Sequence, residues 1–203
     1  MTAWPPTAAL LRTTLLAAVA LVALAVSPTV PLAQSGAESW ALLRQPGHVA
    51  FMRHSDAPGS GGYGDPPGYR LDDCATQRNL SDEGRAHARR TGEAFRKQGV
   101  VFDRVLTSPW CRCKETARLA MGKEAEIFTP LSNLVGRSEH REPQVKALKA
   151  YLAGLGANTR ALFVTHGIVV NALTGVSLAS GEMVIVKVGP SGEPTVVGRL
   201  MVD

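Results

Sequence analysis

The feature that most restricts the fold is a short apolar run that ends in two basic side chains and leads into a loop. Residues 48–52 read His-Val-Ala-Phe-Met, Arg53 and His54 follow, and Gly or Pro occupies four of the next eight positions. The run is typical of a buried strand, and the Gly and Pro residues predict a loop. Arg53 and His54 are therefore expected at the carboxyl end of a strand, where open α/β sheets bind ligands. A guanidinium beside an imidazole suits an anion, above all phosphate, although the same pair also occurs at ordinary polar strand ends.

Segments typical of strands and helices alternate along the rest of the chain. Strands are expected over residues 48–53, within 100–107 with its centre at 104–106, and over 126–128, 161–165, 183–188 and 195–202. Helices are expected over residues 39–45 capped by Ser39, 82–98 capped by Ser81, a segment from Ser108 to 121 with Pro109 at the first helical position, 142–155 and 168–173. This alternation predicts the α/β class, as a three-layer α/β/α sandwich with a mostly parallel sheet.

Three functional side chains share one expected position in such a fold. His54 and His166 each follow directly on a buried strand, and Arg112 lies in the first turn of a helix that follows another strand. Because parallel strands all end at the same edge of the sheet, these groups are expected to meet in one crevice. A phosphate there would meet guanidinium groups, imidazoles and the N–H groups of helix N-termini.

Length and composition indicate one globular domain with a small anionic partner. The chain has 203 residues, of which 45% are hydrophobic and 19% charged, which excludes a disordered protein. The net charge is +5, and the basic residues are scattered without a long Lys/Arg run. This distribution argues against a nucleic-acid partner and fits an anionic substrate.

The beginning of the sequence is typical of a secretory signal. One positive charge precedes an apolar core over residues 15–26, and Ser-Pro follows it. We expect a signal peptide over residues 1–37, with cleavage after Ala33 or Ala37, and a single domain over residues 38–203. The core is short for a bilayer span, so no stable membrane insertion is expected after cleavage. The protein is then periplasmic or secreted; the alternative is an uncleaved N-terminal anchor.

Three cysteines in an oxidising compartment permit one disulfide. Cys111 and Cys113 are too close in sequence to pair easily with each other. Cys74 is therefore expected to pair with one of them, which would tie the loop before Arg78 to the segment that holds Arg112. The alternative is three buried free thiols.

Four segments resemble one known family, in the order in which that family carries them. Residues 51–54 (Phe-Met-Arg-His) look like the Arg-His-Gly motif of the histidine phosphatase superfamily, and residues 80–85 (Leu-Ser-Asp-Glu-Gly-Arg) look like its Leu-Thr-x-x-Gly segment. Residues 108–117 resemble its Ser-Pro…Arg…Thr-Ala helix, and residues 164–167 (Val-Thr-His-Gly) resemble its second histidine motif. The resemblance implies a phosphoglycerate-mutase-like fold and a single histidine phosphatase domain.

The resemblance also implies roles for the basic side chains. His54 would be the nucleophile that forms a phosphohistidine, for which it must be neutral. Arg53, Arg112 and His166 would bind the phosphoryl oxygens and stabilise the charge of the transition state. Arg78 is a further candidate phosphate ligand, with a surface arginine as the alternative. No metal and no cofactor is expected.

Two positions depart from the family pattern. Ser55 stands where Gly usually follows the histidine, and Asn133 stands where many members carry a Glu that acts as the acid. Candidate substitutes for that acid are Asp56, Glu139 and Glu142. Asp56 is preferred, because Arg-His-x-Asp resembles the short phosphohistidine phosphatases; its alternative role is to cap a turn.

The expected function is therefore an exported phosphomonoesterase that acts on a small phosphorylated substrate through a phosphohistidine on His54. The stretch from Cys74 to Asn79 and the small size resemble periplasmic lipopolysaccharide core heptose phosphate phosphatases. Two alternatives remain open. One is a phosphatase for phosphohistidine or another phosphoramidate, and the other is a catalytically silent phosphate-binding protein.

Overall fold

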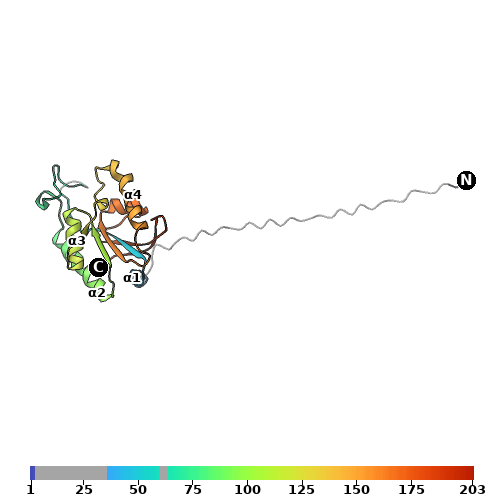
Figure 1. Ribbon diagram of the computed structural model, residues 1–203, viewed down its shortest axis with the longest axis horizontal. Helices are drawn as coiled ribbons and strands as arrows, with labels where there is room; N and C mark the ends of the chain where they lie inside the picture. Colours follow the sequence, from blue (N-terminus) through green and yellow to red (C-terminus); the bar gives the residue numbers. More distant parts are fainter. Residues whose placement is uncertain (3–35, 60–63) are drawn as a thin grey trace. The chain divides into compact units, whose positions relative to one another are not determined.

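A computed structural model describes residues 1–2, 36–59 and 64–203 of the chain (Figure 1). The expected signal peptide, residues 1–37, falls almost entirely outside the described residues. Among those that are described, no helix is both long and apolar enough to cross a membrane.

The core of the fold is a six-stranded sheet with the strand order β3-β2-β4-β1-β5-β6. Its strands are β1 (His48–Arg53), β2 (Arg104–Thr107), β3 (Glu126–Ile127), β4 (Ala161–Thr165), β5 (Met183–Val188) and β6 (Pro194–Leu200). Strands β3, β2, β4 and β1 are parallel, whereas β5 and β6 pair antiparallel to their neighbours. The expected α/β class and mostly parallel sheet are confirmed.

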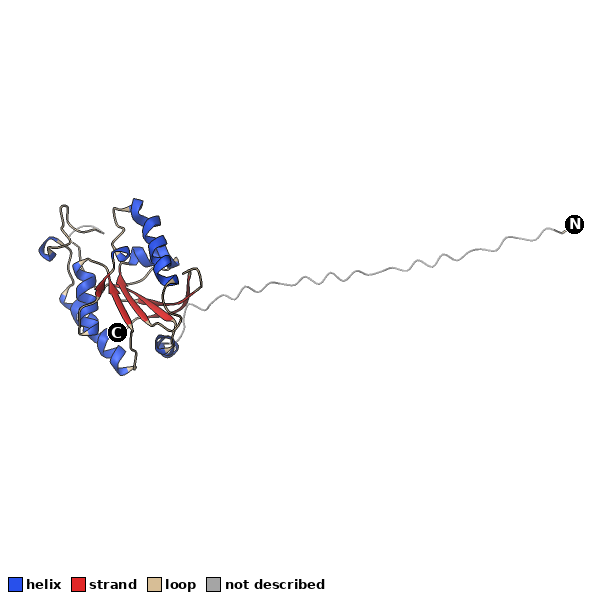
Figure 2. Cartoon of the chain, in the orientation of Figure 1, coloured by secondary structure: helices blue, strands red, loops and turns tan. Residues whose placement is uncertain are grey.

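Helices cover both faces of the sheet (Figure 2). They are α1 (Gly36–Arg44), α2 (Asp82–Lys97), α3 (Cys111–Met121), α4 (Arg141–Ala153) and α5 (Gly167–Thr174), with short 3₁₀ helices at Cys74–Thr76, Thr129–Leu131 and Ser138–His140. Side chains alternate along each strand, so the central strands β1 and β4 contribute to two separate cores. The arrangement is the expected three-layer sandwich.

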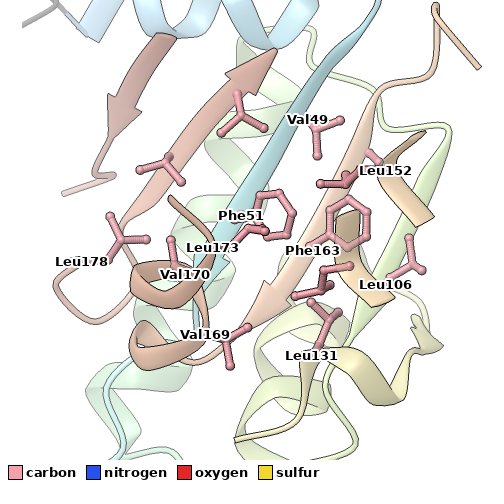
Figure 3. Close-up of a cluster of buried hydrophobic side chains, with 14 of the residues drawn as sticks. Val49, Phe51, Leu106, Leu131, Leu152, Phe163, Val169, Val170, Leu173 and Leu178 are labelled. Atoms are coloured by element: carbon pink, nitrogen blue, oxygen red, sulfur yellow. The ribbon is translucent and has the colours of Figure 1, made fainter. Parts of the chain in front are cut away.

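One core lies between the sheet and helices α4 and α5 (Figure 3). Phe51 of β1 and Phe163 of β4 stack at its centre, with ring centroids 4.7 Å apart. The other core lies on the opposite face, where Met52 and Val164 pack with side chains of α1, α2 and α3. Both central strands are therefore buried on both faces, which explains their nearly continuous apolar sequences.

Two expected helix starts are wrong. Ser39 does not cap α1 but lies inside it, where its hydroxyl donates to the carbonyl of Arg199 at 2.7 Å. Pro109 does not occupy the first turn of α3, because that helix begins two residues later at Cys111. By contrast, Ser81 caps α2 as expected, since its Oγ accepts from the N–H of Gly84 at 2.9 Å.

The disulfide joins Cys74 to Cys111, and Cys113 is a buried free thiol. Of the two partners left open for Cys74, the structure therefore selects Cys111. Residues two apart on a helix point in different directions, so only one of the two can face the loop. Cys113 instead packs inward, with its Sγ 3.5 Å from Nε2 of His166.

Helices α2 and α3 pack so closely that only glycine fits at residue 92. A Cβ at Gly92 would overlap the carbonyl oxygen of Ala120, which is backbone and cannot move aside cheaply. We expect Gly92→Ala to lower the free energy of unfolding by about 1–3 kcal/mol, as overpacking does elsewhere. Urea unfolding followed by circular dichroism measures this loss.

Gly154→Ala is the matched control. Residue 154 has an ordinary φ of −84°, and an added Cβ would meet nothing closer than 3.5 Å. Its effect should stay within about 0.5 kcal/mol of the original protein. Equal losses in the two variants would contradict the close approach of α2 and α3.

Candidate active site

The register of β1 and β4 places the two expected histidines side by side. Arg53 pairs with Thr165 at the carboxyl ends of these neighbouring strands, so His54 and His166 follow at the same level. The backbone N–H of His54 donates to the carbonyl of Thr165 at 2.9 Å. The two imidazole rings lie edge to face with centroids 5.4 Å apart.

Arg112 reaches the histidines from the first turn of α3. Strand β2 lies on the other side of β4, and the helix that follows it begins at the same edge of the sheet. The Nε–H of Arg112 is directed at Nε2 of His54 at 3.3 Å, and its Nη2 lies 3.4 Å from Nδ1 of His166. His54, His166 and Arg112, which are far apart in sequence, thus meet as the sequence predicts.

These side chains line a pocket of about 460 Å³. Its described lining consists of Arg53, His54, Arg78, Arg112, Asn133, Val135, His166, Gly167, Ile168, Asn171, Ser177 and Leu178. Five of the six residues expected at the site are in this set, and Asp56 is not. The volume exceeds that of a phosphate group, so the pocket has space for part of a substrate beyond phosphorus.

His54 is held as a neutral base with its free nitrogen toward Arg112. Its Nδ1 lies 2.8 Å from the carbonyl oxygen of Ser55, and a carbonyl only accepts, so Nδ1 carries the hydrogen. Nε2 then carries a lone pair. Burial, followed by the positive charge of Arg112, lowers the pKa of His54 to about 3. The imidazole is therefore unprotonated at neutral pH.

His166 is also neutral, with the opposite tautomer. Nη2 of Arg112 only donates, so Nδ1 of His166 accepts, and its Nε2–H faces Oγ of Ser108 at 2.9 Å. Burial, followed by the neighbouring His54 and Arg112, holds the pKa of His166 well below its ordinary value. Its Nδ1 remains available to take a proton once an anion enters.

Arg53 and Arg78 complete a positively charged surface. Nη1 of Arg53 donates to the carbonyl of Leu178 at 2.8 Å, and its side chain passes against Gly167, where a Cβ would come within 3.1 Å of Arg53 Cδ. The buried Nε of Arg78 has no hydrogen-bond partner among the described residues. An unpaired buried N–H is costly, and an anion in the pocket would supply the missing acceptor.

The carboxylates considered as the acid lie elsewhere. The carboxylate of Asp56 accepts from the Ser81 hydroxyl at 2.7 Å, which is the contact of a group that caps a turn. Glu139 is exposed and pairs with His140 at 3.3 Å, and Glu142 lines a different cavity. The structure therefore does not bring any of the three carboxylates together with His54.

Asn133 does line the pocket, at the position where the family pattern has Glu. It is almost fully buried, and its Oδ1 accepts from the N–H of Val135 at 3.2 Å. Its amide nitrogen has no hydrogen-bond partner among the described residues and can donate a hydrogen bond, although it cannot release a proton.

Ser55, which replaces the usual Gly, fits without strain. No non-Gly residue in the described segments has a positive φ, so the turn after the nucleophile accepts a side chain. The Ser55 hydroxyl donates to Nδ1 of His87 at 3.1 Å, and Nε2–H of His87 donates to the carbonyl of Val202 at 2.8 Å. This chain of hydrogen bonds holds Ser55, whose carbonyl accepts from Nδ1 of His54.

One residue of the site was missed by the sequence analysis. Asp65, in the loop after β1, forms a buried ion pair with Arg112 in which Oδ1 and Nη1 are 2.6 Å apart. The sequence around it is rich in Gly and Pro, which indicate a loop but not where that loop packs. A buried basic residue requires a counter-ion, and Arg112 was expected in the site. That requirement was the one available sign that a carboxylate lies beside it.

Across the described residues, no three His, Cys, Asp or Glu side chains are grouped so that they could hold a metal ion. The polar groups of the pocket are predominantly N–H donors, which suits an anion rather than a cation.

Comparisons with known proteins agree with this geometry. Residues 72–134 match the family model described as the histidine phosphatase superfamily, branch 1. No curated protein matches the sequence.

Solved structures with the same fold include several phosphatases. The protein histidine phosphatase SixA complexed with tungstate is similar with a TM-score of 0.57 and 23% identity, over 76% of this chain and 96% of that one. A phosphoserine phosphatase from Entamoeba histolytica in complex with 3-phosphoglyceric acid has a TM-score of 0.56 and 14% identity, over 75% and 95%. A putative alpha-ribazole-5'-P phosphatase from Escherichia coli has a TM-score of 0.55 and 16% identity, over 77% and 96%.

The segment matched by the family model includes helix α3 with Arg112, whereas His54 and His166 lie outside it. The chain therefore shares the fold of these phosphatases, and its residues 72–134 are similar to the histidine phosphatase superfamily, branch 1.

Proposed function

We propose that the protein is a phosphatase that hydrolyses a small phosphorylated substrate through a phosphohistidine on His54. The observation that carries the proposal is the unprotonated Nε2 of His54, which faces Nε–H of Arg112 inside a pocket with two further guanidinium groups. A nucleophile with a lone pair and a charged site for the phosphoryl oxygens are the two parts that this chemistry requires.

The charge of the pocket suits a phosphate monoester. Three guanidinium groups, those of Arg53, Arg78 and Arg112, line it, and Asp65 is the carboxylate paired with them. Because both histidines are neutral, the described groups leave an excess of two positive charges, which balances a dianion. The excess also explains why the histidines resist protonation in the free protein.

The reaction proceeds in two displacements at phosphorus. Nε2 of His54 forms a bond to phosphorus while the bond to the leaving group breaks, and the leaving atom takes up a proton. Water then attacks phosphorus, the N–P bond breaks, and His54 is regenerated with its lone pair. Arg53, Arg112 and His166 hold the equatorial oxygens, whose charge grows in the transition state.

A second candidate function, the hydrolysis of phosphoramidates such as phosphohistidine, is favoured by Asn133. The described pocket lining includes no carboxylic acid, and Asn133 can only donate a hydrogen bond toward the leaving group. An alkoxide leaves poorly without a proton donor, whereas a phosphoramidate nitrogen or a phenolate leaves readily. The similarity to a structure described as a protein histidine phosphatase supports this candidate.

Export is part of the proposal. The apolar run over residues 15–26 supports a signal peptide, with residues 38–203 as the exported domain. The disulfide between Cys74 and Cys111 supports a periplasmic or secreted location, because such bonds persist in oxidising compartments. The proposal requires no metal or cofactor, and a lipopolysaccharide core heptose phosphate remains one candidate substrate.

Hydrolysis of p-nitrophenyl phosphate tests the main proposal. The protein should release p-nitrophenolate, and His54→Ala should lower kcat by at least about 10³-fold, since the nucleophile is lost. Acid quenching during turnover should trap a phosphohistidine on residue 54. His140→Ala, at an exposed histidine outside the pocket, is the control and should retain activity. A protein that binds phosphate without any turnover would instead support the catalytically silent alternative.

Substitution at Asn133 tests the requirement for a leaving-group proton. Asn133→Glu should raise the rate on an alkyl phosphate relative to p-nitrophenyl phosphate by about tenfold or more, because it adds an acid where the described lining has none. Asn171→Glu places the same group elsewhere in the same pocket and controls for the added charge. Unchanged ratios in Asn133→Glu, or equal changes in both variants, would contradict the role given to Asn133.

The depressed pKa of His54 predicts a loss of stability in acid. Its pKa falls from 6.5 to about 3 on folding, so between these pH values the unfolded chain binds a proton that the folded chain does not. The free energy of unfolding therefore decreases as the pH falls through this window, and His54 alone should cost about 2 kcal/mol between pH 7 and pH 5.

Urea unfolding at both pH values measures that cost. His54→Gln should lose about 2 kcal/mol less than the original protein between pH 7 and pH 5. His140→Gln should show the original pH dependence. If His54→Gln lost as much stability as the original protein, His54 would not be buried in its neutral form.

A further inference from the structure

We propose that Asp65 is a positioning residue that holds the guanidinium plane of Arg112 so that two of its N–H groups face the space between His54 and His166. The inference rests on the proposed phosphatase function. It adds a residue outside the motifs through which the chain resembles its family.

The carboxylate of Asp65 is fully occupied by donors. Oδ1 accepts from Nη1 of Arg112 at 2.6 Å and from the backbone N–H of Arg78 at 3.1 Å. Oδ2 accepts from Nη2 of Arg112 at 3.2 Å and from Nε1 of Trp110 at 3.0 Å. The side chains of Asp65 and Arg112 are each only 1% exposed. Hydrogen bonds from Trp110 and from the backbone of Arg78 therefore hold the carboxylate in place independently of Arg112.

This arrangement divides the five hydrogens of the guanidinium group. Nη1 directs its two hydrogens at Asp65 and at the carbonyl of Arg78, the latter at 3.3 Å. Nη2 directs one at Asp65 and one at Nδ1 of His166, and Nε directs its single hydrogen at Nε2 of His54. The contacts to the histidines, at 3.3 and 3.4 Å, are longer and weaker than both contacts to Asp65. A phosphoryl group entering between the rings takes over these two hydrogens, while Asp65 and the carbonyl of Arg78 keep the other three.

Asp65 cannot serve as the missing general acid. Burial alone would raise the pKa of its carboxyl, but the hydrogen bonds and charge of Arg112 lower that pKa below its ordinary value. An ionised carboxylate with four donors has no proton to give. Its contribution to the reaction is to orient Arg112, and its charge weakens rather than strengthens the attraction of the pocket for anions.

Because Asp65 both orients Arg112 and carries a negative charge, its replacement should affect phosphate binding and substrate turnover in opposite directions. Asp65→Asn removes a negative charge, so inorganic phosphate should inhibit as strongly as before or up to about tenfold more strongly. The same change leaves Arg112 free to rotate, so kcat on p-nitrophenyl phosphate should fall by about 10- to 100-fold. A variant that is merely less stable would not lower kcat while keeping or strengthening the inhibition by phosphate.

The experiment compares two oxyanions and a matched control. Vanadate can take the five-coordinate geometry of the transition state, so its preference over phosphate should fall in Asp65→Asn by about the same factor as kcat. Asp73→Asn, in the same loop, removes a carboxylate that caps a 3₁₀ helix and contacts Arg70, and should leave both quantities unchanged. Asp65→Asn with an unchanged kcat, or with an unchanged vanadate-to-phosphate ratio, would overturn the proposal.

Two further measurements keep the outcome clear. If Asp65→Asn does not fold, Trp110→Phe removes the Nε1–H donor to Oδ2, together with part of a buried ring that lies against His166. It should lower kcat by about 3- to 10-fold, and an unchanged kcat there counts against the proposal. Nitrogen-15 spectra of the arginine side chains should show a hindered Arg112 guanidinium, and rotation should become fast in Asp65→Asn. This signal does not depend on turnover, so a protein without phosphatase activity would refute the function and still test the role of Asp65.

Discussion

The parallel pairing of β1 with β4 is the constraint on which the site depends. Because Arg53 lies opposite Thr165, the residues that follow both strands emerge together at one edge of the sheet. A shift of one residue in this register would turn the apolar side chains of a strand to the opposite face and break both cores. Phe51 and Phe163, stacked at the centre of one core, oppose such a shift. The same packing that stabilises the sheet therefore brings the two histidines together.

Burial and the nearby positive charges both lower the pKa values of His54 and His166. Both effects disfavour the imidazolium form, so His54 keeps its lone pair and His166 keeps an unprotonated Nδ1. The cost is a pocket with uncompensated cations, including the unpaired Nε of Arg78. An anion in the pocket would offset that excess positive charge, which is one of the causes that lower the pKa of His166. The pocket is thus complementary to an anion, because its positive charges are not fully compensated by the protein's own groups.

Much of this fold can be predicted from local sequence patterns. Strands β1 and β4 match their expected bounds, because a fully buried strand leaves an unbroken apolar run. Ser81 was identified as a cap because a helix start needs a nearby acceptor. Ser39 and Pro109 have the same local signals, but packing places the starts of their helices elsewhere. Local propensity therefore predicts which elements exist better than where they begin.

The rest of the site depends on contacts between distant segments. Asp65 lies in a loop whose sequence has no periodicity, so nothing local indicates that its carboxylate is buried against α3. The disulfide partner of Cys74 was likewise open, because it depends on which side of α3 faces the loop. Asp56, which was expected to be the proton donor, is close to His54 in sequence but not in its side-chain contacts. Its closeness to His54 in sequence does not place its carboxylate in the pocket, since it bonds to Ser81 instead.

The hydrogen bonds behind the nucleophile extend its support beyond the neighbouring strands. The carbonyl of Ser55 fixes Nδ1–H of His54, and the hydroxyl of Ser55 is tied through His87 to the carbonyl of Val202. The segment after β6 thus belongs to the scaffold of the reactive imidazole, although it lies outside the pocket. A peptide added or removed near Val202 would therefore act on the orientation of a ring more than 140 residues earlier in the chain.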